Sequence, residues 1–362
     1  LHLTSNYQTR VYIEVIDELP YQLQKRDLSY QVILKGKASK EFVYTIQPKT
    51  RGVYTFNSIN AYVTTSIGFV QRRFEFDKEM ETGVYPSILQ MRKHEFQVFN
   101  KSAASQGVKK IRKLGNTNEF EQIKEYVVGD DIKHINWKAT SRRAELMVNQ
   151  YQDEKSQQIY CIIDKSRSMR MPFNDLSLLD YAINSTLVMS NIALKKGDKA
   201  GLITFSDKIG TELTANRNAV QLRRIMEVLY KQKTDFLEPN FELLYQSIRK
   251  TVKGRSLLLL FTNFESMYSL ERALPVLRKL HKNYLLVTIM FENTEISDAA
   301  EMECKDVSDI YLKTFAKKFV DEKKFMISEL RTHGIQSILT KPENLSVNAI
   351  NKYLELKSRG MI

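Results

Sequence analysis

Residues 162–169 read Ile-Ile-Asp-Lys-Ser-Arg-Ser-Met. An apolar run over residues 159–163 ends at Asp164, and Ser166 and Ser168 follow at alternate positions. A short apolar run bounded by polar residues is typical of a buried strand. A turn that leaves such a strand can direct short side chains at one spot. The stretch therefore predicts a buried strand that ends in a cluster of side-chain oxygens.

From residue 155 onward, apolar strand-like runs alternate with helix-like segments. The expected strands cover residues 159–163, 200–205, 257–262, 285–291 and 335–339. The expected helices cover residues 176–194, 219–230, 241–249, 270–280, 311–330 and 345–356. This alternation predicts a doubly wound α/β domain over 155–362, with a mainly parallel sheet and helices on both faces. Ligands of such sheets bind beyond the carboxyl ends of the strands, which is where residues 164–168 fall.

Residues 1–86 follow a period of two, which is typical of strands with one buried face. The expected strands cover residues 11–15, 31–34, 41–46 and 53–56, and residues 66–76 read as a strand pair with Gly68 at its bend. This part predicts an immunoglobulin-like β-sandwich. Residues 87–154 form a polar, charge-mixed connector, in which residues 101–115 are the predicted flexible loop.

The composition bounds the class of protein. The chain has 362 residues, 43% of them hydrophobic, which is enough for two domains or a little more. Its 55 Lys and Arg against 42 Asp and Glu give a formal net charge of +13. This excess is compatible with nucleic acid, an anionic membrane or an acidic partner, and equally with a solvated basic surface, because it is spread along the chain.

Two cysteines, Cys161 and Cys304, favour a reducing compartment, and Cys161 is expected to be a small core residue. No apolar run reaches the length of about eighteen residues that a membrane span needs. The chain begins at Leu1 without a Met. We therefore expect a soluble piece of a longer protein.

The oxygens of Asp164, Ser166 and Ser168 predict a cation site. Mg²⁺ prefers oxygen ligands in octahedral geometry and usually keeps several waters. Further ligands have to come from other strand ends, and Asn263 is one candidate. The other is Thr234 or Glu238, which both precede the helix expected at residue 241.

The second half resembles a von Willebrand factor A domain, whose metal-ion-dependent adhesion site is built on an Asp-x-Ser-x-Ser loop. The resemblance implies binding of a partner through Mg²⁺ or another divalent cation. Asn263 stands where many A domains have Asp, which weakens the attraction for a cation, so the resemblance implies that Asn263→Asp would tighten metal binding. A relic loop in which Asp164 accepts nearby backbone amides remains the alternative.

Residues 120–143 contain a second signature. They read Phe-Glu-Gln-Ile-Lys-Glu-Tyr-Val-Val-Gly-Asp-Asp-Ile-Lys-His-Ile-Asn-Trp-Lys-Ala-Thr-Ser-Arg-Arg. This resembles the hallmark of the domain-of-unknown-function 58 (DUF58) family, Glu-Tyr-x-x-Gly-Asp-Asp-x-Arg-x-Ile-Asp-Trp-Lys-x-x-x-Arg. The resemblance covers residues 120–340, and the sandwich ahead of it is similar to longer members.

The resemblance to this family implies a bacterial scaffold or adaptor. Its relatives often begin with a membrane hairpin, which would precede Leu1, and they tend to be encoded near MoxR-type AAA+ ATPases. The implied place is the cytoplasmic side of the bacterial inner membrane.

Within the signature, Gly129 is expected to allow a left-handed turn that frees Asp130 and Asp131 to accept backbone amides. Trp137 is the only tryptophan and is expected to be a packing anchor for the connector. Arg142 is expected in an ion-pair network around it. A docking surface for a partner is the alternative reading of these residues.

Catalysis and nucleic-acid binding are not favoured. A phosphoryl-accepting Asp164 would need a second carboxylate two residues later, where Ser166 stands. The five histidines show no nucleophile partner, and phosphate loops, zinc spacings and dinucleotide fingerprints are absent from the sequence. The basic stretches at 109–113, 142–143 and 317–318 are short and lack interleaved aromatics. The sequence thus predicts a non-enzymatic interaction protein, with a metal-free membrane-associated scaffold as the leading alternative.

Overall fold

The computed structural model describes residues 1–25, 28–77, 79–86, 114–128, 130, 132–152, 156–174, 176–304 and 306–361. The chain divides into two compact units. One consists of Leu1–Pro86 with Met226–Gln232, and the other of Ser87–Ile225 with Lys233–Ile362. The predicted boundaries at residues 86 and 154 stay a prediction.

The larger unit is built on a six-stranded sheet with the order β15-β14-β11-β16-β17-β18. Its parallel strands are β11 (Gln158–Asp164), β14 (Lys199–Phe205), β16 (Leu257–Phe261), β17 (Leu285–Phe291) and β18 (Gln336–Thr340). The edge strand β15 (Ile209–Asn216) pairs antiparallel with β14. In chain order this is 3-2-1-4-5-6, an arrangement of doubly wound folds, so the predicted α/β architecture is confirmed.

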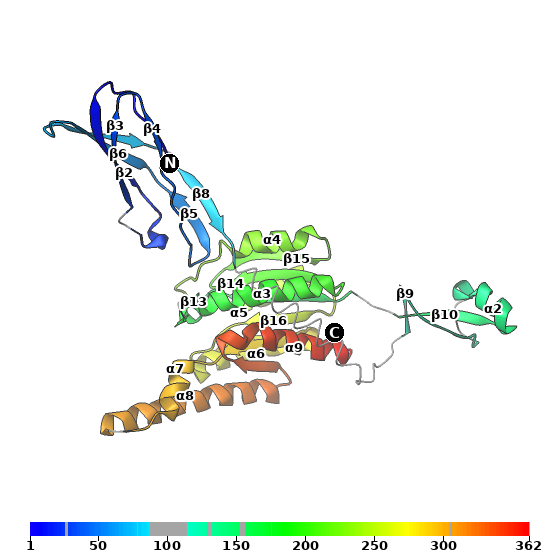
Figure 1. Cartoon of the computed structure of the whole chain (residues 1–362). Coiled ribbons are helices and arrows are strands. Elements are labelled where there is room, and N and C mark those ends of the chain that lie inside the picture. Colours follow the sequence, from blue (N-terminus) through cyan, green and yellow to red (C-terminus); the bar gives the residue numbers. More distant parts are fainter. Residues whose placement is uncertain are drawn as a thin grey trace. The chain divides into compact units, whose positions relative to one another are not determined.

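Helices cover both faces of this sheet. Helices α3 (Leu178–Lys195) and α9 (Leu345–Ser358) pack together on the face turned to the viewer in Figure 1. The opposite face is covered by α5 (Phe241–Thr251), α6 (Met267–Asn283) and α8 (Val307–Thr332). The remaining helices are α4 (Val220–Leu229) and α7 (Thr294–Glu301), the latter against α8. Of the described helices, none is both long and apolar enough to cross a bilayer.

The central strand β11 is buried on both faces. Its residues Ile159, Ile162 and Ile163 are at most 2% exposed. A strand with neighbours in the sheet and helices on both sides is a continuous apolar run, as the sequence reads. Truncating such a residue to Ala costs about 2–5 kcal/mol. This rigid strand fixes the position of Asp164 at its carboxyl end.

Polar side chains fix where the helices begin. The Ser177 hydroxyl accepts the amide of Asp180, and the Ser177 amide donates to the Asp180 carboxylate, which forms a capping box at the start of α3. Asn240 caps α5 by accepting the amide of Leu243. Such caps satisfy amides that lack a partner within the helix. The segments that lead into α3 and α5 are therefore fixed where these helices begin.

The described part of residues 1–86, which makes up most of the smaller unit, is all-β apart from the 3-10 turn Tyr21–Leu23. Strands β2 (Arg10–Asp17), β3 (Ser29–Lys35), β6 (Ile59–Thr65) and β7 (Gln71–Phe76) form an antiparallel sheet with the order β3-β2-β6-β7. Two ribbons pair β1 (His2–Thr4) with β4 (Ser39–Glu41), and β5 (Gly52–Phe56) with β8 (Met80–Val84). The all-β prediction is confirmed, and the immunoglobulin-like sandwich stays a prediction.

The connector contains more regular structure than the sequence suggested. A hairpin of β9 (Leu114–Glu125) and β10 (Met147–Gln152) encloses the 3-10 turn Ile132–His134 and helix α2 (Trp137–Arg143). Most of the predicted flexible loop, residues 101–113, lies outside the described residues.

Two further differences have physical reasons. The strand expected over residues 41–46 ends at Glu41, because β4 pairs only over three residues with the equally short β1. Strand β15 was not expected, because its residues are half-buried or exposed rather than apolar throughout. Gly68, expected at a bend, lies in the turn between β6 and β7 at a φ of 84°, where Gly is unstrained.

Candidate metal centre and signature hairpin

Asp164 closes β11 and is completely buried. Its Oδ1 accepts the amide of Ser166 at 2.8 Å, and its Oδ2 accepts the hydroxyl of Thr262 at 2.6 Å. Burial raises the pKa of the Asp164 carboxyl, and the hydrogen bonds from Thr262 and Ser166 counter this only in part. A desolvated carboxylate of this kind is stabilised by any cation that comes close.

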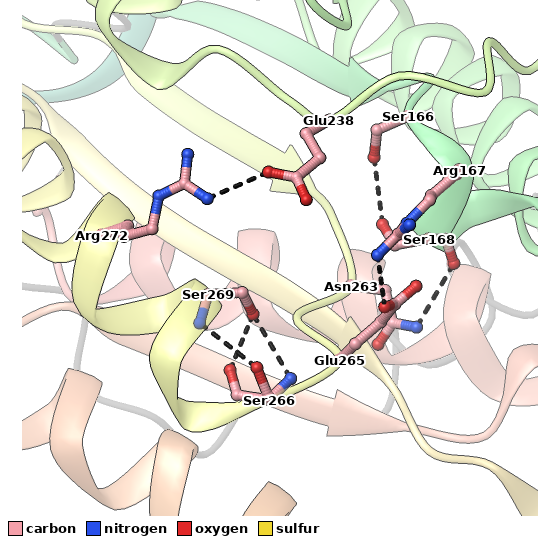
Figure 2. Close-up of polar contacts among 9 residues, drawn as sticks. All are labelled: Ser166, Arg167, Ser168, Glu238, Asn263, Glu265, Ser266, Ser269 and Arg272. Atoms are coloured by element: carbon pink, nitrogen blue, oxygen red, sulfur yellow. Dashed lines mark hydrogen bonds and ion pairs between the residues drawn. The ribbon is translucent and has the colours of Figure 1, made fainter.

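The two serines lie together at this strand end. The Oγ atoms of Ser166 and Ser168 are 3.1 Å apart (Figure 2). Ser166 is fully buried, while Ser168 is half-buried. The loop is held because the amide of Lys165 donates to the Phe205 carbonyl at the end of the neighbouring strand.

Asn263 follows β16 and reaches the same loop. Its Nδ2 lies 3.5 Å from the carbonyl oxygen of Ser168, and Figure 2 draws this contact as a dashed line. Its Oδ1 instead accepts the Lys323 ammonium at 2.7 Å. Lys323 lies on α8 and also donates to the carbonyl of Phe264. Burial lowers the pKa of Lys323 to about 8, so the side chain is still mainly charged at neutral pH.

The two alternatives for the remaining ligand do not join this cluster. Glu238 forms an ion pair with Arg272 at 3.0 Å, and both side chains are more than half exposed (Figure 2). Thr234 lines a pocket beside the loop. Within the described part of the chain, no hydrogen bond connects Thr234 or Glu238 with Asp164, Ser166 or Ser168.

That pocket encloses about 500 Å³ at the carboxyl ends of β11 and β14. It is lined by Lys165, Ser206, Asp207, Lys208, Ile209, Gly210, Thr234, Asp235, Phe236 and Leu237. The Asp235 carboxylate accepts Ser206 at 2.8 Å and Lys165 at 3.2 Å. Burial raises the pKa of Asp235, but these two hydrogen bonds and the Lys165 charge outweigh it, so the pKa lies below its ordinary value. Asp235 is therefore an anion whose charge is already paired with Lys165.

The residues at the loop fit a divalent cation in part. Ligand oxygens at neighbouring positions of a Mg²⁺ octahedron lie about 3 Å apart, given bonds of about 2.1 Å. The 3.1 Å between the Ser166 and Ser168 oxygens matches this spacing, and Asp164 supplies the negative charge. No described group of three or more His, Cys, Asp or Glu side chains is arranged to hold a metal. Any cation here would thus depend on hydroxyls and a single carboxylate.

The signature hairpin is only partly described, since Gly129 and Asp131 lie outside the described residues. The Asp130 carboxylate accepts a hydrogen bond from the amide of Val127 at 3.0 Å, as expected. It also forms an ion pair with Lys124 at 2.9 Å. The hydrogen bond from Lys124 and then that from the Val127 amide keep the pKa of Asp130 below its ordinary value. Lys124 was not expected here, although its position in the quoted signature is visible.

Trp137 was expected to be a packing anchor for the connector. Its side chain is 69% exposed. The reason is local, because Trp137 is the first residue of the seven-residue helix α2, which buries none of its own residues. Arg142 lies in the last turn of the same helix and is exposed as well. The packing role and the docking role of these residues both stay predictions.

Several solved structures resemble the chain at low similarity. The SpRpn10 VWA domain is 13% identical, with 54% of this chain and 95% of that chain covered and a TM-score of 0.32. BatB from Bacteroides thetaiotaomicron is also 13% identical, with 57% and 100% covered and a TM-score of 0.32. Proximal thread matrix protein 1 from the mussel byssus, with a zinc-occupied MIDAS motif, is 17% identical, with 38% and 36% covered and a TM-score of 0.26.

Two comparisons of sequence also match the chain. The uncharacterized protein YeaD of Bacillus subtilis (strain 168) is 21% identical over 168 residues, which are 46% of this chain and 39% of YeaD. The matching segment thus spans well under half of that relative. The model of the family described as protein of unknown function DUF58 matches residues 122–317, which is more than half of the chain. The chain therefore belongs to the DUF58 family.

Proposed function

We propose that this chain is a non-enzymatic protein-interaction module that binds an acidic side chain of a partner through a divalent cation. Ser166 and Ser168 would ligate Mg²⁺ or a similar ion directly, and Asp164 directly or through water. The observation that supports this most is the spacing of 3.1 Å between the two serine oxygens beside a fully buried carboxylate. A partner carboxylate would complete the shell.

The residue chemistry supports binding rather than catalysis. General acid–base chemistry needs a titratable group within hydrogen-bond reach of the reacting atom. Asp164 has both oxygens engaged by Ser166 and Thr262, and it is shielded from solvent. Lys323 has the carbonyl of Phe264 and the Asn263 oxygen as acceptors. The contacts of Asp164 and Lys323 fix the conformation of the neighbouring loops, and neither side chain is placed to exchange protons with a substrate.

The partner follows from the family context. The resemblance to DUF58 proteins implies a MoxR-type AAA+ ATPase as the partner and the cytoplasmic side of the bacterial inner membrane as the place. We include both in the proposal, with a membrane tether upstream of Leu1. Nucleic acid is not part of it.

The test is the affinity for a purified MoxR-type ATPase, measured with Mg²⁺ and with EDTA. We expect EDTA to weaken binding at least tenfold, and Asp164→Ala and the pair Ser166→Ala with Ser168→Ala to weaken it equally in Mg²⁺. The control is Ser308→Ala, on the exposed first turn of α8. Affinity that neither EDTA nor the loop variants change would exclude the cation bridge.

A second candidate, a metal-free membrane-associated scaffold, is favoured by the surface of α8. Val307, Tyr311, Phe315 and Phe319 lie four residues apart and are each at least 50% exposed. Side chains spaced by four lie on one side of a helix. Exposed lysines, Lys317, Lys318 and Lys324, accompany this stripe. An aromatic stripe with basic neighbours is typical of helices that bind an anionic membrane surface.

Vesicle binding separates the two candidates. We expect the chain to cosediment with vesicles that contain anionic phospholipid and to bind neutral vesicles less, with EDTA having no effect. Phe315→Ser with Phe319→Ser should abolish this binding, whereas Tyr268→Ser, at an exposed aromatic of α6, should leave it unchanged. Equal binding by the α8 variant would rule out the stripe as the membrane contact.

A further inference from the structure

Lys323 places its ammonium group at the end of β16. It lies in the second half of α8, sixty residues from Asn263 in sequence, and its ammonium contacts the Asn263 oxygen and the Phe264 carbonyl. Glu265 and Glu322 also stabilise the charged form through their fields. Helix α8 packs against β18 and α6, so Lys323 projects from a fixed element. The packing of α8 therefore fixes the position from which Lys323 contacts Asn263 and Phe264.

The ammonium determines how the Asn263 amide is oriented. A lysine ammonium only donates hydrogen bonds, so Asn263 has to present its oxygen to Lys323. The amide NH₂ then points the other way, toward the carbonyl of Ser168 at 3.5 Å. An NH₂ group has no lone pair to offer a metal. At the position where A domains often have a carboxylate ligand, the loop therefore meets a hydrogen-bond donor.

We propose that Lys323 supplies the positive charge at this strand end. By binding the Asn263 oxygen, Lys323 turns the Asn263 NH₂ group toward the loop, so that Asn263 cannot be a ligand of a metal bound at Ser166 and Ser168. Lys323 lies beside the loop of the proposed function, and the proposal for Lys323 rests on that function in one respect, the binding of an ion at this loop. Lys323 thereby determines how many protein ligands the ion can have. The resemblance alone did not indicate Lys323.

A consequence follows for Asn263→Asp, which the resemblance alone would predict to tighten metal binding. With Lys323 present, the new carboxylate would form an ion pair with the ammonium, which neutralises the charge that should attract the metal. The gain in metal affinity should therefore appear only when Lys323 is also replaced. Residues in direct contact are expected to show such non-additivity.

The experiment is a calorimetric titration with Mn²⁺ in neutral buffer of wild type, Asn263→Asp, Lys323→Gln and the double variant. Gln is chosen because its amide can still donate to the Phe264 carbonyl. We expect Asn263→Asp to change the Kd for Mn²⁺ less than threefold and the double variant to bind at least tenfold more tightly than Asn263→Asp. Lys324→Gln, at the adjacent exposed lysine, is the matched control and should not mimic Lys323→Gln.

Melting temperatures provide a second readout. In EDTA, Asn263→Asp should melt higher than wild type because it gains an ion pair, and the double variant should melt lower because its carboxylate has no partner. Mn²⁺ should then raise the melting temperature of the double variant most. If Lys323→Gln fails to fold, Lys323→Met takes its place in the same cycle.

The outcomes separate this inference from the proposed function. If wild type binds no Mn²⁺ but the double variant does, the cation bridge fails and the role of Lys323 stands. If Asn263→Asp alone gains the full affinity, the role of Lys323 is overturned, and the cation bridge stands as long as the wild type binds Mn²⁺ as well. If no variant gains affinity for Mn²⁺, the inference on Lys323 is overturned as well.

Discussion

At the scale of single residues, Asp164 has a cost in stability and a proposed use. It is completely buried, and burial raises its pKa above the ordinary value of 3.8. A carboxyl whose folded-state pKa is raised contributes stability below its unfolded-state pKa, and this contribution is lost as the pH rises through the folded-state value. At neutral pH and without a cation, the charged form therefore destabilises the fold.

We predict that Asp164→Asn melts higher than wild type in EDTA at neutral pH. The amide keeps an oxygen for the Ser166 amide and an NH₂ for the Thr262 oxygen, and it removes the buried charge. The difference in melting temperature should shrink as the pH falls and vanish below about pH 3, where Asp164 is protonated in both the folded and the unfolded state. Thermal melts across pH test this.

Asp164→Ala is the control, because it leaves the Ser166 amide and the Thr262 hydroxyl without an acceptor. A buried unpaired group costs about 1–3 kcal/mol, so this variant should melt below wild type. If Asp164→Asn were also less stable than wild type at neutral pH, the account of Asp164 as a desolvated carboxylate would be wrong.

At the scale of elements, the closing helix α9 is attached to the sheet through a buried carboxylate. Asp198, 1% exposed, precedes β14 and accepts Tyr353 Oη at 2.5 Å, Lys357 Nζ at 2.9 Å and the Gln157 amide at 3.0 Å. Tyr353 and Lys357 both lie on α9. This network connects residues about 155 positions apart in sequence.

We predict that Tyr353→Phe lowers the free energy of unfolding by about 1.5–3 kcal/mol, the range for a hydrogen bond to a charged group. Urea unfolding of the variant against wild type measures it. Tyr268→Phe on α6 is the control, because that side chain is 69% exposed and should change the free energy by less than about 0.5 kcal/mol. A neutral result for Tyr353→Phe would mean that the hydroxyl does not hold α9.

Some helices and strands could be predicted from the sequence and others could not. Strand β17 matches the expected residues 285–291 because it is apolar throughout and buried on both faces. Strand β15 and helix α7 were missed, since each has a mixed surface pattern rather than a continuous apolar one.

The candidate site, too, could be predicted from the sequence only in part. The Asp164 loop was visible because its residues are neighbours in sequence and follow a buried strand. The contact between Asn263 and Lys323 was not, because only the packing of α8 against the sheet brings these two residues together. Thr262 was within reach of the sequence, since it directly precedes Asn263 at a strand end.

At the scale of the whole molecule, the proposed cation is a ligand of a folded unit. The core of the larger unit is closed by apolar side chains from α5, α6 and α8. We therefore predict that EDTA leaves the chain folded, and that Mg²⁺ at about ten times its Kd adds about 1.4 kcal/mol to the free energy of unfolding. Thermal melts with and without Mg²⁺ measure this, and unfolding by EDTA alone would contradict it.

The most direct test of the central claim is anomalous diffraction from crystals of the chain soaked in Mn²⁺. The account predicts one strong peak at about 2.1 Å from the Oγ atoms of both Ser166 and Ser168, and loss of that peak in crystals of Ser166→Ala with Ser168→Ala. A loop without any Mn²⁺ peak, or the same peak in the variant crystals, would contradict it.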